Sequence, residues 1–203
     1  MITLPTSYFG PIEEYVYLSQ NESVTYEVKE HFIKQSYRNR CFIYGSNGLL
    51  RLTVPLVLKS REKTSIEDIK ISYAEQWRAQ HWRSIQSAYK NSPFFDYYEE
   101  IISPIFLEEF KNLKALNFKA LETINNCLQI NCKVLFNENF KPYSENDLRL
   151  KIHPKKGPTV ELPRYIQVFE DKYGFKKNLS ILDLLFNEGP SAILYLQKIG
   201  LAK

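Results

Sequence analysis

The pattern of hydrophobic positions changes character near residue 72. Before this point, short runs rich in β-branched and aromatic residues predict strands at residues 2–4, 23–28, 41–44, 49–58 and 64–72. After it, apolar residues recur at helical spacing and predict helices at residues 75–91, from 95, from 104, at 118–128, from 180 and from 190. Strands first and helices later indicate an α+β fold, mostly strands in the N-terminal part and mostly helices in the C-terminal part.

Local signals indicate where several of these elements end. Asn47-Gly48 lies between two strand runs, and because both residues tolerate positive φ this pair predicts a hairpin. The first helix should end before Ser92-Pro93, since a residue ahead of proline is pushed out of the α region. Residues 136–163 show no clear period. We expect a long loop there, which either closes over a site or packs against the sheet.

Composition indicates a packed globular protein. With 203 residues, 44% hydrophobic residues and 7 glycines, the chain is expected to form a single domain over 1–203. A formal charge of +4 is modest, which argues against a protein that coats nucleic acid. No leader and no run near the ~18 apolar residues of a membrane span is present, so we expect a cytoplasmic protein. The three cysteines lack a neighbouring His and read as buried thiols; we expect no metal and identify no cofactor.

The first candidate site lies on the predicted helix at residues 75–91. At 100° per residue, Trp77, Arg78, His81 and Trp82 share one aromatic face. A buried guanidinium or imidazole has to be hydrogen-bonded or paired. The two polar residues therefore either anchor a structural network or line a pocket. In the second interpretation His81 is the general base or acid, because its ordinary pKa lies near neutrality.

The second candidate is the segment 34–40, KQSYRNR. In an extended conformation Lys34, Arg38 and Arg40 would share one face. Arginine suits bidentate recognition of phosphate or carboxylate, and Tyr37 and Asn39 add further donors beside it. The alternative is a set of surface ion pairs with two nearby acids, Glu27 and Glu30.

The third candidate is the basic segment His153-Pro154-Lys155-Lys156. It is either a solvated loop or a part of an anion site, to which His153 and Lys155 contribute together with the residues above. The standard signatures of hydrolases and metalloenzymes are absent: there is no glycine-rich phosphate loop, no nucleophile elbow, no HExxH and no CxxC.

Several blocks in order carry a family resemblance. They are SYFGPIEEY, YRNRC, SNGLLRLTVPL, ISYAEQWRAQHWRSIQSAYKNSPFFDYY, IHPKK and GFKKNLSILDLLFNEGP. Over nearly its whole length the chain resembles the WbqC-like protein family. The resemblance implies a place in bacterial surface polysaccharide biosynthesis, O-antigen included, and the attachment of glycine or a related amino acid to a sugar. Many relatives open with His-Gln-Pro, whereas this chain has Leu4-Pro5-Thr6-Ser7-Tyr8, which leaves His81 as the base.

We therefore predict a transferase that moves an aminoacyl or acyl group onto an activated sugar. The cations of segment 34–40 would hold the phosphates of a nucleotide-sugar or other phosphorylated molecule, His81 would remove the acceptor proton, and Arg78 would orient a carboxyl or phosphate. The alternative is a non-enzymatic binding or assembly module that docks an acidic partner. The residues assigned to substrate binding are Tyr8, Lys34, Tyr37, Arg38, Asn39, Arg40, Trp77, Trp82, His153 and Lys155.

Overall fold

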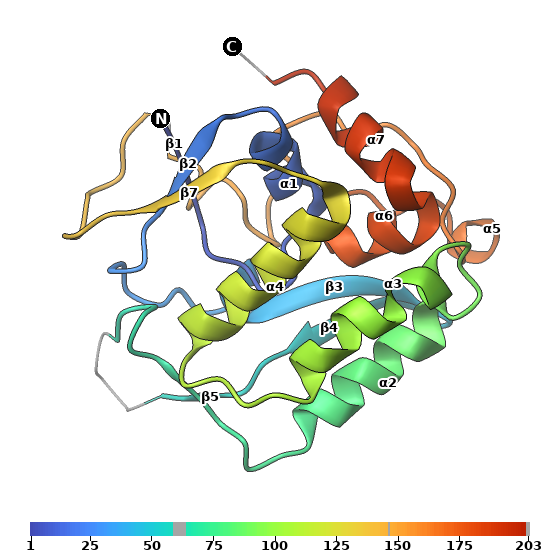
Figure 1. Cartoon of the computed structure of the whole chain (residues 1–203), viewed down its shortest axis with the longest axis horizontal. Helices are drawn as coiled ribbons and strands as arrows, with labels where there is room; N and C mark the ends of the chain where they lie inside the picture. Colours follow the sequence, from blue (N-terminus) through green and yellow to red (C-terminus); the bar gives the residue numbers. More distant parts are fainter. Residues whose placement is uncertain (59–63, 146, 202–203) are drawn as a thin grey trace.

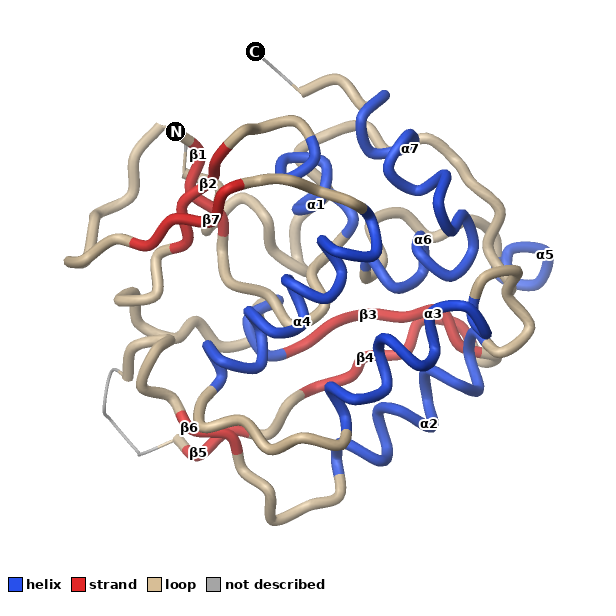
Figure 2. The backbone as a smooth tube through the Cα atoms, viewed as in Figure 1, coloured by secondary structure: helices blue, strands red, loops and turns tan. Residues whose placement is uncertain are grey.

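The computed structural model describes residues 1–58, 64–145 and 147–201 and has the predicted α+β architecture. Figure 1 shows a small sheet at the upper left, a hairpin across the middle, and helices on both sides of that hairpin. Figure 2 separates the strands from the long irregular segments that connect them. Among the described residues, no helix is long and apolar enough to cross a membrane.

The small sheet contains three parallel strands, β1 (Ile2–Leu4), β2 (Ser23–Tyr26) and β7 (Lys133–Phe136), in the order β1-β2-β7. Helix α1 (Ile12–Ser19) connects β1 to β2, so the chain opens with a βαβ unit that the sequence did not predict. The reason is burial: every residue from Ile12 to Leu18 is buried, including Glu13 and Glu14. No polar face remains to reveal a helical period.

The predicted hairpin is confirmed. β3 (Arg40–Gly45) pairs with β4 (Gly48–Thr53) in antiparallel register, with Gly45 opposite Gly48. The positive φ expected for both Asn47 and Gly48 belongs to Gly48 alone, at 98°. Side chains alternate across the hairpin, so Cys41 is buried on its inner face against α2 while Arg40 lies on the outer face.

Two other local predictions were wrong. Segment 34–40 is not extended, because Ser36 caps a 3₁₀ turn, η1 (Tyr37–Asn39), and accepts a hydrogen bond from the Arg38 amide. Within residues 64–72, where a strand was expected, the structure has the two-residue strand β6 (Lys70–Ile71). It pairs with β5 (Leu56–Val57) in antiparallel register. Ahead of β6 the chain forms a turn, in which the Ile69 amide donates to the Ser65 carbonyl. Ile66 and Ile69 are both buried in this turn rather than in a strand.

The helical half agrees closely with the sequence. The aromatic helix is α2 (Trp77–Tyr89). The helix predicted at residues 118–128 is α4 (Leu113–Leu128), which begins earlier than expected because Asn112 caps it by accepting a hydrogen bond from the Ala115 amide. The short strand β7 before the loop was not predicted. The remaining helical elements are α3 (Phe95–Ile102), η2 (Ser103–Phe106), α5 (Glu170–Tyr173), α6 (Ile181–Glu188), η3 (Gly189–Ser191) and α7 (Ala192–Lys198).

Candidate functional site

A buried pair of ions lies just beyond the carboxyl end of β2. Arg38 is fully buried, and its Nε and Nη2 donate to Glu30 Oε1 at 2.7 and 2.5 Å. The prediction that acids near segment 34–40 pair with its arginines is thus confirmed for Glu30, although the pair is buried rather than on the surface. Glu27 has another role: its carboxylate accepts hydrogen bonds from the amide of Lys141 and the side chain of Asn137.

A second buried arginine joins this pair from the long loop. Arg149 Nη2 donates to Asp147 Oδ2 at 2.5 Å, and its Nη1 lies 3.6 Å from Glu30 Oε2. Its guanidinium lies over the Tyr143 ring, 4.4 Å from the centroid. The sequence did not single out Arg149, and the one available signal was the spacing Asp-x-Arg in a segment without period. We call Glu30, Arg38, Asp147 and Arg149 the buried ion network.

The network connects the long loop to the sheet. The Leu148 amide donates to the Thr3 carbonyl at 2.8 Å, and Asp147 bridges Thr3. In the described part of segment 136–163, the loop thus packs along the edge of β1. The parallel strands end on this side, and carboxyl ends of parallel strands are where open α/β sheets usually bind ligands. Within the described residues, Arg38 Nη1 and Arg149 Nη1 are buried without a hydrogen-bond partner.

Positive charge gathers around His153, next to this network. Burial lowers the pKa of His153, and the charges of Arg38, Lys155, Lys156 and Arg40 lower it further. The Lys155 amide donates to His153 Nδ1 at 3.2 Å, which places the proton of the neutral ring on Nε2. We call these five residues the basic centre. The structure thus brings together Arg38, Arg40, His153 and Lys155, which the sequence had placed in two separate candidates.

Arg40 is the member of the basic centre best suited to meet a ligand. Its side chain is half-buried, and its Nε is buried without a partner among the described residues. Burial and the nearby charge of Arg51 lower its pKa, so its charge is poorly compensated. A guanidinium with a free donor and excess positive potential favours an anion.

A small pocket of about 160 Å³ lies on the outer face of the hairpin. Phe42 and Leu49 in its wall share this outer face with Arg40 and Arg51. Glu13 fixes the opposite wall, because its carboxylate accepts hydrogen bonds from the Thr159 amide at 2.8 Å and from Asn178 Nδ2 at 2.6 Å. The residues lining the pocket are Tyr37, Phe42, Leu49, Pro154, Lys156, Pro158, Lys177, Asn178 and Leu179.

His81 has the surroundings of a structural histidine. It is buried, its Nδ1 lies 3.0 Å from the Tyr8 hydroxyl, and it also bonds to the backbone of Thr53. Burial lowers the pKa of His81 to about 4. The ring is therefore neutral at pH 7, with Nε2 donating to the Thr53 carbonyl and Nδ1 accepting from Tyr8. Its role as a base remains a prediction, and either bond would have to break first.

Arg78 lies apart from the other predicted site residues. It is half-buried rather than turned inward, and its Nη1 donates to the carbonyls of Leu107 and Glu108 at 2.8 Å each. A salt bridge to Glu109 and contact with the Tyr73 ring complete its surroundings. These contacts hold the turn that follows η2 against α2.

The other predicted residues are distributed between core and surface. Lys34 is exposed, whereas Asn39 is buried and donates to the Val54 carbonyl at 2.8 Å. Trp77 is buried beside His81, and the half-buried Trp82 packs on Phe95 and Phe106 rather than on a free surface. These tryptophans are core residues of α2 in this structure.

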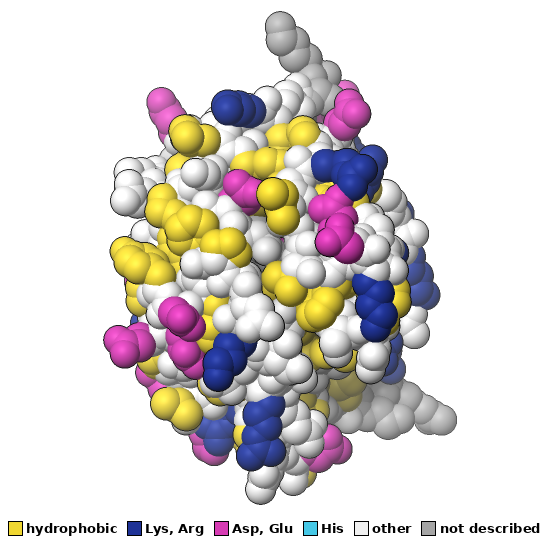
Figure 3. Space-filling model, turned by 90° about the vertical axis from the view of Figure 1, so that its right-hand side faces the viewer, with side chains coloured by type: hydrophobic (Ala, Val, Ile, Leu, Met, Phe, Trp, Pro, Cys, Tyr) yellow, Lys and Arg dark blue, Asp and Glu magenta, His cyan; other side chains and the backbone are white. Residues whose placement is uncertain are grey.

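Charge on another face of the molecule is mixed. In the side view of Figure 3, Lys and Arg side chains alternate with Asp and Glu, and hydrophobic side chains form several separate small groups. That face presents no area of a single sign. The basic centre differs from that face, because its four positive side chains lie close enough together to lower the pKa of one histidine, His153.

Comparison with known proteins identifies the family. A model of the WbqC-like protein family matches residues 7–159, and the chain therefore belongs to this family. It is 29% identical over 194 residues to the uncharacterized protein Rv1507c of Mycobacterium tuberculosis (strain ATCC 25618 / H37Rv), with 82% of this chain and 84% of that protein covered. No solved structure matches the chain.

Proposed function

We propose that this WbqC-like protein binds a small phosphorylated or carboxylated molecule at the basic centre and transfers an aminoacyl or acyl group from it to a sugar. The convergence of four cations on one neutral histidine, beside a pocket of about 160 Å³, is the observation that carries the proposal. Arg40, whose charge acts on His153, has a buried Nε without a partner among the described residues, although it does not line the pocket itself. Such groups stabilise an anion more strongly when water is excluded.

In this proposal the basic centre holds the leaving group of the transfer. A hydroxyl or amine of the sugar attacks the acyl carbon, and a new ester or amide bond forms. The bond from the acyl carbon to the phosphate breaks, and the phosphate leaves with the electron pair while Arg40 and the lysines hold its charge. The acceptor proton passes to Nδ1 of His153, in place of the exposed 3.2 Å hydrogen bond from the Lys155 amide. The pKa of His153 rises once the anion is bound, because an opposite charge favours the protonated ring.

Transfer to a sugar is supported by the family rather than by the geometry. The resemblance to WbqC-like proteins implies surface polysaccharide biosynthesis and the attachment of glycine or a related amino acid. The basic centre supports the anionic half of that reaction, since an activated aminoacyl or sugar donor carries phosphate. The pocket next to it matches a small group rather than a whole nucleotide-sugar.

A thermal-shift panel tests the proposal. We expect one class among nucleotide-sugars, aminoacyl-adenylate mimics, acyl phosphates and acyl-CoAs to stabilise the protein, by about 2.7 kcal/mol at 100 times its dissociation constant. The stabilisation should vanish in Arg40→Gln. It should persist in the matched control Lys90→Gln, which removes an exposed charge on α2. An equal shift in both variants would place the ligand elsewhere.

A non-enzymatic binding module is the second candidate function. The observation that favours it is the engagement of both His81 ring nitrogens, which removes that residue as a ready base. In this case the basic centre docks an acidic partner without turnover. Binding of a panel compound that is lost in Arg40→Gln, with no product from any sugar acceptor, would favour the module over the transferase.

A further inference from the structure

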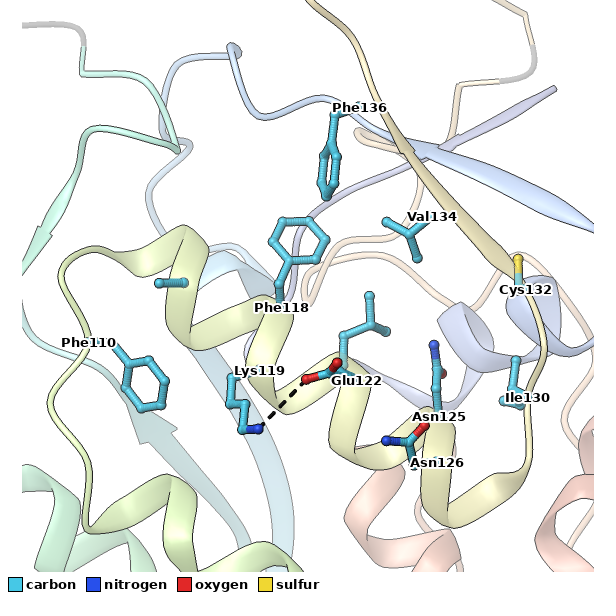
Figure 4. Close-up of a pocket in the computed structure, with 12 residues that line it drawn as sticks. Phe110, Phe118, Lys119, Glu122, Asn125, Asn126, Ile130, Cys132, Val134 and Phe136 are labelled. Carbon is cyan, nitrogen blue, oxygen red and sulfur yellow. Dashed lines mark ion pairs between the residues drawn. The ribbon is translucent and has the colours of Figure 1, made fainter.

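A second hollow lies between α4 and β7, and none of the five residues of the basic centre lines it. It is a groove of about 640 Å³, within the size range of ligand sites. In Figure 4, Phe118 and Phe136 meet at one end, while Ile130 and Cys132 lie at the other. The residues lining it are Phe110, Ala115, Phe118, Lys119, Leu121, Glu122, Asn125, Asn126, Ile130, Cys132, Val134 and Phe136.

Among the described residues, no strand pairs with the outer edge of β7, which runs along this groove. β7 is the last strand in the order β1-β2-β7, and the Lys133 amide donates to the Glu22 carbonyl next to β2. In a parallel ladder alternate residues face the neighbouring strand. The backbone N–H and C=O groups of Lys133 and Leu135 therefore point toward β2. Those of Val134 and Phe136 point outward, away from the sheet. The side chains of these same two residues line the groove.

Helix α4 reaches past this edge. One row of its side chains lies under β7: the Phe118 ring packs edge-on against Phe136 with centroids 4.8 Å apart, and Leu121 and Asn125 are buried. The neighbouring row is exposed although it lines the groove, and it contains Ala115, Lys119, Glu122 and Asn126. A fourth strand beside β7 would cover this row. The groove is thus the space that one more strand would fill.

Asn125 adds a polar group to the floor of the groove. It is 8% exposed, and its Oδ1 is buried without a hydrogen-bond partner among the described residues. Figure 4 shows its side chain between α4 and the strand that ends at Phe136. A buried acceptor of this kind favours an occupant that brings a donor, such as a peptide N–H or a polar side chain.

The charges around the groove select among occupants. In the wall of the groove Lys119 and Glu122 form an ion pair at 3.7 Å. Two further positive charges lie beside the groove: Lys133 belongs to β7, and the Lys114 ammonium lies 5.1 Å from the centroid of the Phe136 ring. Two copies of this chain that paired through β7 would bring these lysines together and repel each other. An acidic partner is attracted instead.

We infer that the groove binds an extended acidic peptide of another protein, which adds to β7 as a fourth strand. Its backbone bonds with the open N–H and C=O groups of Val134 and Phe136, and apolar side chains at alternate positions enter the groove between Phe110 and Phe118. Acidic residues between these positions point to the opposite face of the sheet, where the side chain of Lys133 lies. This mode of recognition gives affinity through the backbone and specificity through the alternate side chains.

The probe for this inference is a fluorescein-labelled pool of synthetic decapeptides with apolar residues at alternate positions between aspartates. We expect saturable binding and slower amide exchange at Val134 and Phe136. Val134→Pro removes an outward donor without breaking the ladder to β2 and should weaken binding about tenfold or more. Should this variant fail to fold, Lys133→Glu should weaken binding about threefold or more through charge reversal.

Three results would overturn the inference. One is equal binding of a control pool with the same composition but contiguous apolar residues, because alternation would then play no part. Another is binding unchanged in both Val134→Pro and Lys133→Glu. The third is a peptide-free dimer in light scattering that Val134→Pro dissociates, since the occupant would then be a second copy. Loss of binding in Arg40→Gln is not expected, which separates this groove from the basic centre.

Discussion

Replacing Arg38 with Leu is expected to lower the free energy of unfolding by about 3–5 kcal/mol, because it leaves the buried carboxylate of Glu30 with an uncompensated charge. Arg38 makes two hydrogen bonds to Glu30 Oε1, and both side chains are almost fully buried. Arg149 still lies near Glu30, but its nearest atom is 3.6 Å away. Urea unfolding monitored by tryptophan fluorescence gives the change directly.

A double variant separates lost pairing from lost packing. Arg38→Leu combined with Glu30→Leu removes both charges and should recover most of the stability that the single change loses. The matched surface control is Arg83→Leu on the exposed side of α2, which should change stability by no more than about 0.5 kcal/mol. A double variant as unstable as Arg38→Leu would mean that packing, not the ion pair, governs this site.

Arg149→Leu is expected to release the long loop while the hairpin stays intact. Arg149 makes its bonds within the loop and to the sheet side of the molecule: it pairs with Asp147, lies near Glu30 and donates to the Lys141 carbonyl. Without these contacts, local opening of residues 137–145 and 147–152 should become at least about tenfold more frequent. Hydrogen exchange by mass spectrometry measures this opening segment by segment.

The same experiment contains its own reference. Amides of β3 and β4 should exchange as slowly as in the unchanged protein, because the hydrogen bonds and ion pairs of the Arg149 side chain within the described residues go to Lys141, Asp147 and Glu30. Lys151→Leu removes a neighbouring exposed cation whose ammonium donates one surface hydrogen bond to the Glu145 carbonyl, and it should change loop exchange far less than Arg149→Leu. Faster exchange throughout the chain would contradict the account, since it would make Arg149 a determinant of global stability.

The sequence predicted the fold where an element had one polar and one apolar face. The hairpin around Asn47-Gly48 and the helix at Trp77–Tyr89 are such elements, and both are present. Helix α1 was not predicted, because Glu13 and Glu14 are buried and accept hydrogen bonds in the folded protein. The hydrophobic periodicity of the sequence cannot reveal such contacts. The partners of Glu13 are Thr159 and Asn178, which lie 146 and 165 residues away in the chain. Only the fold brings them near.

The site was predictable in its residue types but not in its grouping. Arginine and histidine in KQSYRNR and IHPKK indicated anion binding, and the structure places Arg38, Arg40 and His153 within one electrostatic neighbourhood. Arg149 could not be found, because its role depends on the docking of the loop against Thr3. Conversely, the aromatic face of α2 looked like a pocket wall, but in the structure it packs into the core around His81.

The two halves of the basic centre have different physical roles. Arg38 belongs to the buried ion network, and Glu30 engages its Nε and Nη2. Its Nη1 has no partner among the described residues but is buried, so Arg38 contributes to the positive potential rather than to direct contact with a ligand. Arg40 and the lysines are nearer to water and supply the donors that a ligand meets. This division explains why Arg38→Leu should reduce stability, whereas Arg40→Gln should reduce binding.

The titration of His153 by NMR tests the basic centre most directly, because the chain has only three histidines. We expect its pKa to lie below the ordinary value in the free protein and to rise when inorganic phosphate is added, since the anion offsets the charges of Arg40, Lys155 and Lys156. Phosphate should accordingly bind more tightly as the pH falls through that pKa, and the rise should be smaller in Arg40→Gln. A pKa at or above the ordinary value that phosphate does not move would contradict an anion site at this centre.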